Sequence, residues 1–545
     1  MRSILRLWRS PRAAWAAMVV CAALGSGACK GKTDGPRPGA DGAPPAVVNQ
    51  PLLDEEVEPN DRPEQATAIL PGKAVQGRIK NPERGRDIDH YLVTNQHPKG
   101  ILRVEVTGVP GLDLVVSVLQ KSQRKLLAVA NNGGAGAAEI IPNVGVVPGE
   151  YLIVVRESGK KPSHVDAPYT LMASLTPAGP GDEVEPNDTR PDAQDVAVGT
   201  PLSGYFGKRG DVDWYRLRLP DNVPESNLRV ELTGLQSVPF ASFSVQDEIE
   251  VVLKKGQTGR GTGVLYPNLY VKAGQRLLYL VAGGGKRFSP ADKYTITTAL
   301  TPRGPDEERE PNDRVVQATP LAKGQKMKGY LAPAGDEDWY ALEAQGPSIA
   351  RIAVTGVDNV DLTLSLHDAS GTQQLLVDDG KARDGEILPN AYLPGGRALI
   401  RVAGKARQEN IFQTYELTAD LKPAGAGEER EPNNTLAQAN GIEVGGTVSG
   451  YLYPTRDVDL FKLTVPAIGP MAKVIRFEVK GIPKVPLTLV VKDVQGALFA
   501  KAGPTAPEEL LRLEKPMPAG VYTLELSGGG QANPRDAYEL RVTAP

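Results

Sequence analysis

The sequence predicts an all-β protein of four tandem antiparallel β-sandwich, jelly-roll-like domains that follow a signal peptide and a flexible tether. Three observations lead to this prediction. An acidic motif recurs four times, apolar and polar residues alternate between its copies, and a basic and then apolar stretch opens the chain. Alternation with period two is typical of half-buried strands, and no long stretch of the sequence has the period of an α-helix.

The first 28 residues are typical of an export signal. Four arginines and no acidic residue stand near the start: Arg2, Arg6, Arg9 and Arg12. The apolar run at 13–24 is shorter than the ~20 residues that span a bilayer, which favours a signal over a membrane helix. The stretch resembles a bacterial lipoprotein signal, and this implies lipidation of Cys29. Simple secretion stays the alternative, because Ser26 stands where such signals prefer leucine.

Composition narrows the possible partners. Residues 29–54 are rich in Pro and Gly and predict a flexible tether. The two cysteines, Cys21 and Cys29, lie at the N-terminus, so the predicted domains contain no disulfide. Without the four signal arginines, 58 basic residues face 65 acidic ones, a net charge near −7. This charge gives no reason to expect nucleic acid as a partner, and membrane contact is expected only through the lipid anchor.

The acidic motif Glu-x-Glu-Pro-Asn-Asp/Asn occurs at residues 56–61, 183–188, 308–313 and 429–434. Its second glutamates are 127, 125 and 121 residues apart, and a glycine follows each at an offset of 19. An Asp-x-Asp pair comes next, and "IPN", "YPN" or "LPN" appears later in the first three repeats only. The predicted domains are 55–176, 182–301, 307–422 and 428–545.

The third repeat illustrates the strand pattern. Leu362, Leu364 and Leu366 alternate with Thr363 and Ser365, which predicts a strand with its leucines facing the core. Similar runs recur in every repeat, separated by Gly, Asn, Asp and Pro. Each repeat therefore predicts one sandwich of roughly 110 residues, the usual size of a domain with a single core.

The repeated acids predict calcium sites. In an extended segment residues two apart point to the same side, so Glu308 and Glu310 converge, and Pro311 holds the segment extended. Oxygen ligands without imidazole or thiolate favour Ca²⁺ over zinc, copper or Mg²⁺. The predicted ligands are Glu56, Glu58, Asn60, Asp61, Asp87, Asp89, Glu183, Glu185, Asn187, Asp188, Asp211, Asp213, Glu308, Glu310, Asn312, Asp313, Asp336, Asp338, Glu429, Glu431, Asn433, Asn434, Asp457 and Asp459.

The alternative is a repeated surface turn, because Pro-Asn-Asp is a common turn sequence. The fixed offset between the Glu-x-Glu and Asp-x-Asp pairs favours the metal site. The four sites are not equal in sequence. Asn434 replaces an aspartate in the fourth motif, and a longer loop delivers Asp87 and Asp89 in the first. The second and third repeats are therefore the better candidates.

The repeats resemble the bacterial pre-peptidase C-terminal domain. "EPND", the following glycine, "GDVDWY" at 210–215, "GDEDWY" at 335–340 and the closing Tyr-x-Leu strand carry the resemblance, which covers about nine tenths of the chain. It implies a β-sandwich in which calcium orders the linker. Relatives include collagen-binding domains of secreted collagenases. The family usually follows a protease, and no peptidase sequence adjoins these four copies.

Two tryptophans are candidate ligand contacts. Trp214 and Trp339 alternate with core-facing aromatic residues, so their rings are expected on the outer face, where a sugar or peptide can stack. The alternative is that each ring lies under the linker. The aromatic residues expected in the core are Tyr91, Tyr215, Tyr340 and Phe461.

No catalytic motif is found in the sequence. The four histidines share no position across the repeats, and His-Glu-x-x-His, Gly-x-Ser-x-Gly and phosphate-loop patterns are missing. The predicted function is a non-enzymatic, lipid-anchored envelope protein, with the outer membrane favoured, whose calcium-stabilised modules bind a polysaccharide or fibrous protein. The alternatives are a structural spacer and an accessory module that acts in trans with a secreted peptidase.

Overall fold

A computed structural model describes residues 54–80, 86–159, 167–467 and 472–545. The predicted signal peptide, Cys29 and the tether up to residue 53 lie outside these ranges and stay predictions. The described residues are almost entirely strands and loops, and their only helical segments are four short 3-10 turns. The all-β prediction is therefore confirmed. No helix among the described residues has the length and apolar character needed to cross a membrane.

The strands fall into four successive units. The first unit contains η1 (Pro63–Gln65), β1 (Thr67–Ala68), β2 (Ala74–Gly77), β3 (Ile88–Asn95), β4 (Gly100–Val106), β5 (Leu114–Gln120), β6 (Lys125–Ala130), β7 (Glu139–Val146), β8 (Gly149–Glu157) and β9 (Tyr169–Pro177). The second contains η2 (Arg190–Asp192), β10 (Gln194–Ala197), β11 (Leu202–Phe206), β12 (Val212–Arg218), β13 (Ser226–Gly234), β14 (Ser242–Gln246), β15 (Val251–Lys255), β16 (Val264–Val271), β17 (Leu277–Gly283) and β18 (Ser289–Pro302).

The last two units repeat the same plan. The third contains η3 (Val315–Gln317), β19 (Thr319–Leu321), β20 (Lys326–Leu331), β21 (Glu337–Ala344), β22 (Ser348–Val354), β23 (Leu362–His367), β24 (Gln373–Val377), β25 (Glu386–Leu393), β26 (Gly396–Gly404), η4 (Lys405–Arg407) and β27 (Asn410–Pro423). The fourth contains β28 (Asn440–Glu443), β29 (Thr447–Gly450), β30 (Val458–Val465), β31 (Lys473–Lys480), β32 (Thr488–Lys492), β33 (Leu498–Ala502), β34 (Leu511–Met517), β35 (Gly520–Ser527) and β36 (Tyr538–Thr543).

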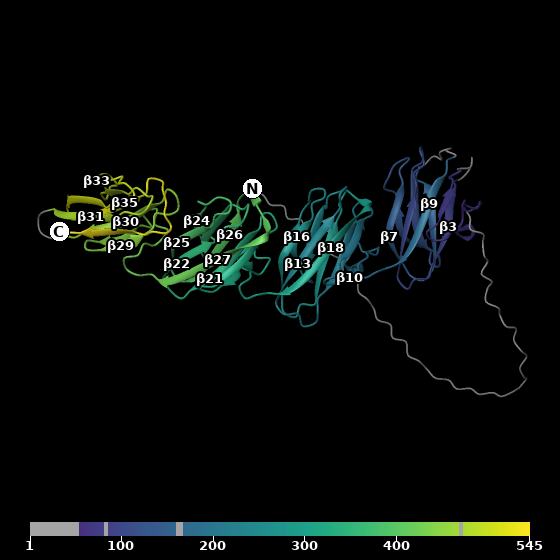
Figure 1. The fold of residues 1–545 in the computed structure, drawn as a ribbon, viewed down its shortest axis with the longest axis horizontal. Coiled ribbons are helices and arrows are strands. Elements are labelled where there is room, and N and C mark those ends of the chain that lie inside the picture. Colours follow the sequence, from purple (N-terminus) through teal and green to yellow (C-terminus); the bar gives the residue numbers. More distant parts are fainter. Residues whose placement is uncertain (1–53, 81–85, 160–166, 468–471) are drawn as a thin grey trace, which may run out of the picture. The chain divides into compact units, whose positions relative to one another are not determined.

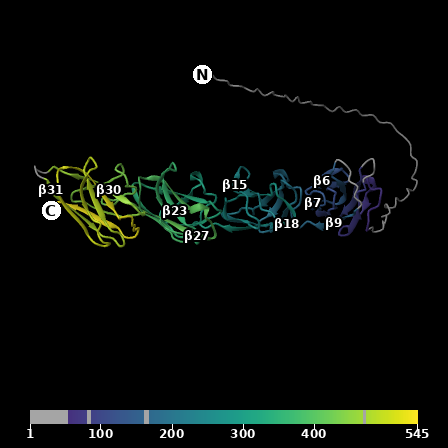
Figure 2. The same cartoon turned by 90° about the horizontal axis from the view of Figure 1, so that it is seen from above.

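Each unit consists of a five-stranded and a four-stranded sheet. In the first unit their strand orders are β1-β3-β8-β5-β6 and β2-β9-β4-β7, and the other three units repeat both orders position by position. In the third unit, β21 and β26 belong to the five-stranded sheet, and β22, β25 and β27 to the four-stranded one (Figure 1). The strands β23 and β27 mark these two sheets in the second view (Figure 2).

One strand pair in each unit corrects the prediction of purely antiparallel sheets. The first and third strands of every unit run parallel, as β19 and β21 do, while the other strand pairs are antiparallel. The chain leaves β19 for the other sheet as β20 and then returns as β21. Because it crosses to the second sheet and back, it runs beside its first strand in the same direction.

The core of each unit lies between its two sheets. In the third unit, Leu362, Leu364 and Leu366 of β23 pack in one apolar cluster with Tyr415 and Leu417 of β27. The leucine face predicted from the sequence is confirmed. Equivalent clusters fill the other three units. Burial of apolar surface between the sheets is the main stabilising contribution in each unit.

Candidate metal centre

The acidic motif forms an extended segment that is paired on both sides. In the third unit, the backbone N–H of Glu308 donates to the carbonyl of Lys328 on β20 at 3.0 Å. On the other side, Tyr270 of β16 donates its N–H to the carbonyl of Glu310 at 2.8 Å. Because β16 belongs to the second unit, the motif is an extended segment that bonds to two successive units. Its alternate side chains point the same way.

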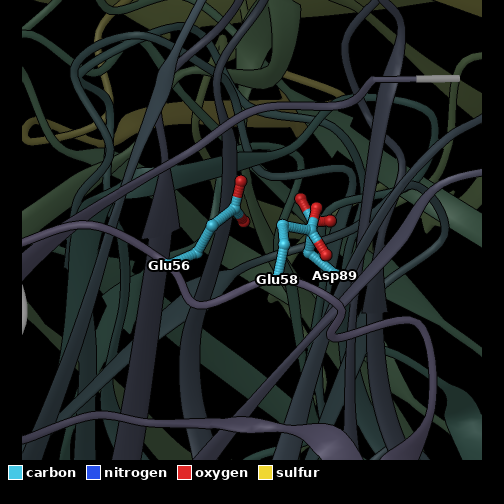
Figure 3. A group of neighbouring side chains, drawn as sticks. All are labelled: Glu56, Glu58 and Asp89. Carbon is cyan, nitrogen blue, oxygen red and sulfur yellow. The ribbon is translucent and has the colours of Figure 1, made fainter.

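Three carboxylates form an inner triad in the third unit. Glu308 and Glu310 of the motif and Asp338 of β21 each offer an oxygen, and these oxygens lie within 4.8 Å of one another. The inner triads of the first two units are Glu56, Glu58, Asp89 and Glu183, Glu185, Asp213. Figure 3 shows the side chains of the first of these triads gathered together.

An outer triad shares one residue with the inner triad. In the third unit it consists of Glu310, Asp313 and Asp336, whose oxygens also lie within 4.8 Å of one another. The outer triad of the second unit is Glu185, Asp188 and Asp211. The second glutamate of the motif therefore lies between two adjoining groups of acids. The Asp-x-Asp pair does return to the Glu-x-Glu pair, as the fixed sequence offset predicts.

Tyrosine hydroxyls support the acids from the core side. Tyr340 of β21 donates to Glu308 Oε2 at 3.0 Å, and Tyr415 of β27 donates to Asp338 Oδ2 at 2.6 Å. The two hydroxyls lie 2.6 Å apart. The first and second units contain the same network through Tyr91, Tyr169, Tyr215 and Tyr294. These tyrosines are fully buried, so the network links both sheets to the acidic motif.

The glycine at an offset of 19 is explained by this network. A Cβ atom on Gly329 would lie 2.4 Å from both Glu308 Oε2 and the hydroxyl of Tyr415. Gly77, Gly204 and Gly450 have equivalent steric limits. Only glycine leaves room for the tyrosine hydroxyl and, in the last three units, for the glutamate beside it.

An asparagine of the preceding unit donates a hydrogen bond to the inner triad. Asn268 donates from Nδ2 to Glu308 Oε1 at 2.7 Å. Pro267 and Asn268 together oppose the single residue Arg229 on β13, which makes a β-bulge in β16. Asn143 and Asn390 occupy the equivalent bulges of the first and third units, and they donate to Glu183 and Glu429.

The bulge accounts for the "PN" sequence in the first three repeats. The strand β34 of the last unit pairs with β31 without a register shift, and Glu514 there lies opposite Arg476. Units that have a following motif thus contain the bulge, and the fourth unit does not. A bulge is a built feature that redirects a side chain.

The first cluster is the more open one. Glu183, Glu308 and Glu429 are at most 2 % exposed, whereas Glu56 is half-buried and Glu58 is exposed. No described residue of a preceding unit covers this first motif. Asn60 is buried, Asp61 accepts a hydrogen bond from Ile88 N at 3.2 Å, and Asp87 accepts one from Lys80 N.

Burial and mutual repulsion destabilise the charged forms of these acids. Burial raises the pKa of Glu308 to about 7 and that of Glu185 to about 8. Burial first, and then the charges of Glu308 and Asp336, raise the pKa of Asp338 well above its ordinary value. Without a cation, such closely packed carboxyl groups retain protons near neutral pH.

Some oxygens in the clusters have no hydrogen-bond partner. Oδ1 of Asn60, Asn187 and Asn433 is buried and unpartnered among the described residues, and so is Oδ1 of Asp213. Asn312 holds the equivalent position in the third unit. Its NH₂ group, in the orientation that satisfies its hydrogen bonds, donates to Glu310 Oε1 and to Asp338 Oδ1, both at 3.0 Å.

The fourth cluster has fewer charges and fewer hydroxyls. Asn434 takes the place of the third acid of the motif, and Phe461 takes the place of a hydroxyl-bearing tyrosine. Glu429 still accepts hydrogen bonds from Tyr538 at 3.2 Å and from Tyr451 N at 2.7 Å. Burial raises the pKa of Asp457 to about 7. The remaining predicted ligands of this unit, Glu431, Asn433 and Asp459, are buried.

The two candidate tryptophans lie on the outer face of the five-stranded sheets, where the alternation placed them. Trp339 is only 8 % exposed, and its ring centre lies 4.7 Å from that of His367. Trp214 packs with Ala193, in the segment after the motif, and with Tyr279. Both rings are thus largely covered, and their contact with a ligand stays a prediction.

Sequence reasoning missed three groups of residues. The sequence places the tyrosines in the core without indicating the contacts of their hydroxyls. A tyrosine at the position of Tyr415 does recur at the start of each closing strand. The asparagines of the bulges, such as Asn268, are visible in the sequence only as part of a recurring "PN" pair, which does not show their hydrogen bond to the next motif. Lys208, in the loop after β11, was not considered, and its single occurrence before the Asp-x-Asp pair was the available signal.

The comparisons with known proteins find likenesses among solved structures alone. No family model and no curated protein matches the chain. The pre-peptidase C-terminal domain of collagenase from Bacillus anthracis is 21 % identical, with 19 % of this chain and 94 % of that one covered and a TM-score of 0.16. The human MASP-1/3 CUB1-EGF-CUB2 region is 9 % identical, with 41 % and 98 % covered and a TM-score of 0.15. The BSP domain of a biofilm associated protein is 8 % identical, with 84 % and 92 % covered and a TM-score of 0.14. At these TM-scores the likenesses assign neither a family nor a function to the chain.

Proposed function

We propose that the acidic clusters are structural Ca²⁺ sites. The observation that carries the proposal is the buried, unpartnered asparagine oxygen that recurs as Asn60, Asn187 and Asn433. Leaving a buried polar atom unpaired costs about 1–3 kcal/mol, so its recurrence at one motif position points to a ligand. Because the same motifs supply the closely packed carboxylates of the triads, the ligand that fits these oxygens is a cation.

The donor set favours calcium among the common cations. Each cluster offers carboxylate and amide oxygens and contains neither thiolate nor imidazole ligands among its predicted members. Ca²⁺ accepts six to eight such oxygens in flexible geometry, whereas Mg²⁺ retains several waters and needs a regular octahedron. In the third unit, Glu310 and Asp338 of the inner triad and Asp313 and Asp336 of the outer triad would hold calcium, whose positive charge would offset their repulsion.

Calcium would fix the motif to its own unit. The motif already bonds to β20 through Glu308 and to β16 through Glu310. An ion that also binds Asp336 and Asp338 would add a cross-link from the motif to β21. We infer that each two-sheet unit is a jelly-roll-like sandwich domain of the pre-peptidase C-terminal type, and that calcium stiffens the segment before it.

Thermal unfolding of the chain without its predicted signal peptide, here called the exported chain, tests the metal proposal. We expect the midpoint to rise in millimolar Ca²⁺ relative to chelator, and to rise much less in Mg²⁺. The double variant Glu310→Gln, Asp336→Asn should lose part of this rise. The matched control is Glu343→Gln, an exposed acid on β21. An unfolding midpoint that calcium leaves unchanged in every variant would show that the motif is a repeated turn and not a metal site.

At the level of the cell, the proposed function is a non-enzymatic, lipid-anchored envelope protein that binds a polymer. Four similar units suit weak attachment to a repeating ligand such as a polysaccharide or fibrous protein, because linked sites raise the effective concentration. Cys29→Ala should release the chain from the membrane fraction. Retention of the purified chain on insoluble polysaccharides or collagen-like fibres tests the binding, and retention on none of them would favour the structural spacer.

A further inference from the structure

The outer triad of the second unit contains a lysine ammonium. Lys208 Nζ lies 2.7 Å from Asp188 Oδ2 and 3.3 Å from Asp211 Oδ1. Its distance to Glu185 Oε1 is 3.7 Å. These three acids are the complete outer triad, so one ammonium reaches every carboxylate of the group. Each distance falls within the range of an ion pair.

The loop that carries Lys208 is held at several points. Gly207 N donates to Asp211 Oδ2 at 2.6 Å, and Gly210 N donates to the carbonyl of Gly285 at 2.6 Å. Asn132 of the first unit donates to the carbonyl of Gly207 at 3.0 Å. The ammonium is thus placed by a fixed loop.

The equivalent positions in later units have no charge. Lys208 stands three residues before Asp211, and the residues three before Asp336 and Asp457 are Pro333 and Pro454. A proline cannot supply a cation to the acids of its unit. The second and third units have the same acids in the motif and in the Asp-x-Asp pair, but of these two units only the second has a lysine three residues before that pair.

We propose that Lys208 is a built-in cation that occupies the outer pocket of the second unit, so that this unit binds one divalent cation fewer than the third. The inference rests on the proposed function, since it concerns how many ions the clusters take. Four methylene groups let the ammonium reach from the loop to all three acids, and one of its N–H groups donates to Asp188 Oδ2 at 2.7 Å. A divalent ion has to displace a tethered charge to enter. The ammonium consequently offsets part of the negative charge of the outer pocket of the second unit even when calcium is scarce.

The test counts calcium ions per exported chain at saturation, by equilibrium dialysis and elemental analysis. Lys208→Met removes the charge and keeps the length, and it should bind one more ion per chain than the wild type. Lys286→Met is the matched control, an exposed lysine of the same unit, and should leave the count unchanged. The reciprocal variant Pro333→Lys should lose one ion, and circular dichroism checks the fold of each variant.

The outcomes separate the two proposals. A wild-type chain that binds calcium, with the same count and affinity in Lys208→Met, would overturn the lysine inference and leave the calcium sites standing. A wild-type chain and Lys208→Met that both bind no calcium would overturn the calcium proposal, and the lysine inference with it. A gain in Lys208→Met together with a loss in Pro333→Lys would support both.

Discussion

Tyr415 donates its hydroxyl hydrogen to Asp338 Oδ2 over 2.6 Å. Tyr415 belongs to β27 of the four-stranded sheet, and Asp338 belongs to β21 of the five-stranded sheet. This contact therefore crosses the core and ends at the inner triad. Tyr294 and Asp213 repeat it in the second unit, also at 2.6 Å. The acidic cluster is thus coupled directly to the packing of the two sheets.

Removal of this hydroxyl should weaken the third unit. Tyr415→Phe keeps the ring but leaves Asp338 without its donor, which costs about 1–3 kcal/mol for a buried acceptor. We expect a lower midpoint in chemical denaturation and a smaller stabilisation by calcium. Tyr330→Phe, whose hydroxyl is not engaged in a described hydrogen bond, is the control and should leave both unchanged. Equal behaviour of the two variants would show that the network does not support the site.

A single methyl group at Gly329 should have a similar effect. The Cβ atom of Gly329→Ala would lie 2.4 Å from Glu308 Oε2 and the Tyr415 hydroxyl, so one of them must move. Overpacking of this kind costs about 1–3 kcal/mol. Gly346→Ala is the matched control, because a Cβ there meets no atom within 4 Å. Denaturant titration compares the two, and a Gly329→Ala chain as stable as the control would contradict the close packing.

The metal-free chain should become less stable as the pH rises. Glu183 and Glu308 have ordinary pKa values of 4.5, which burial raises to about 7 in the folded chain. A raised folded-state pKa contributes stability that is complete below pH 4.5 and is lost as the pH passes through 7. In chelator the unfolding midpoint should fall between pH 5 and pH 8. Calcium should reduce or reverse this fall. A midpoint in chelator that rises over this range would contradict the raised pKa values.

The bulge asparagine should control how firmly the next motif is held. Asn268→Ala removes the donor to Glu308 and should speed hydrogen exchange at the backbone N–H groups of Glu308, Arg309, Glu310 and Asn312. Asn268→Asp places a carboxylate where the amide donated at 2.7 Å, so it should destabilise the chain more than alanine does in chelator. Unchanged exchange in both variants would show that the motif is held without this asparagine.

The sequence alone determined the all-β class, the four repeats and the inward face of strands such as Leu362–His367. It also determined which acids of a motif share a side. These features depend on local periodicity, because side chains alternate along any strand whatever the strand packs against. The pairing of Glu308 with Glu310 follows from the same rule. The distant Asp336 and Asp338 could be associated with them because the offset recurs.

Only the tertiary structure decided the parallel first strand, the hydroxyl contact of Tyr415, the bulge that carries Asn268 and the position of Lys208. Each of these joins residues that lie far apart in the sequence, or selects one of several directions for a flexible side chain. The alternation of residues places Tyr415 in the core but does not determine which group its hydroxyl contacts. That end point is fixed by the distance between the two sheets and by the space that Gly329 leaves open.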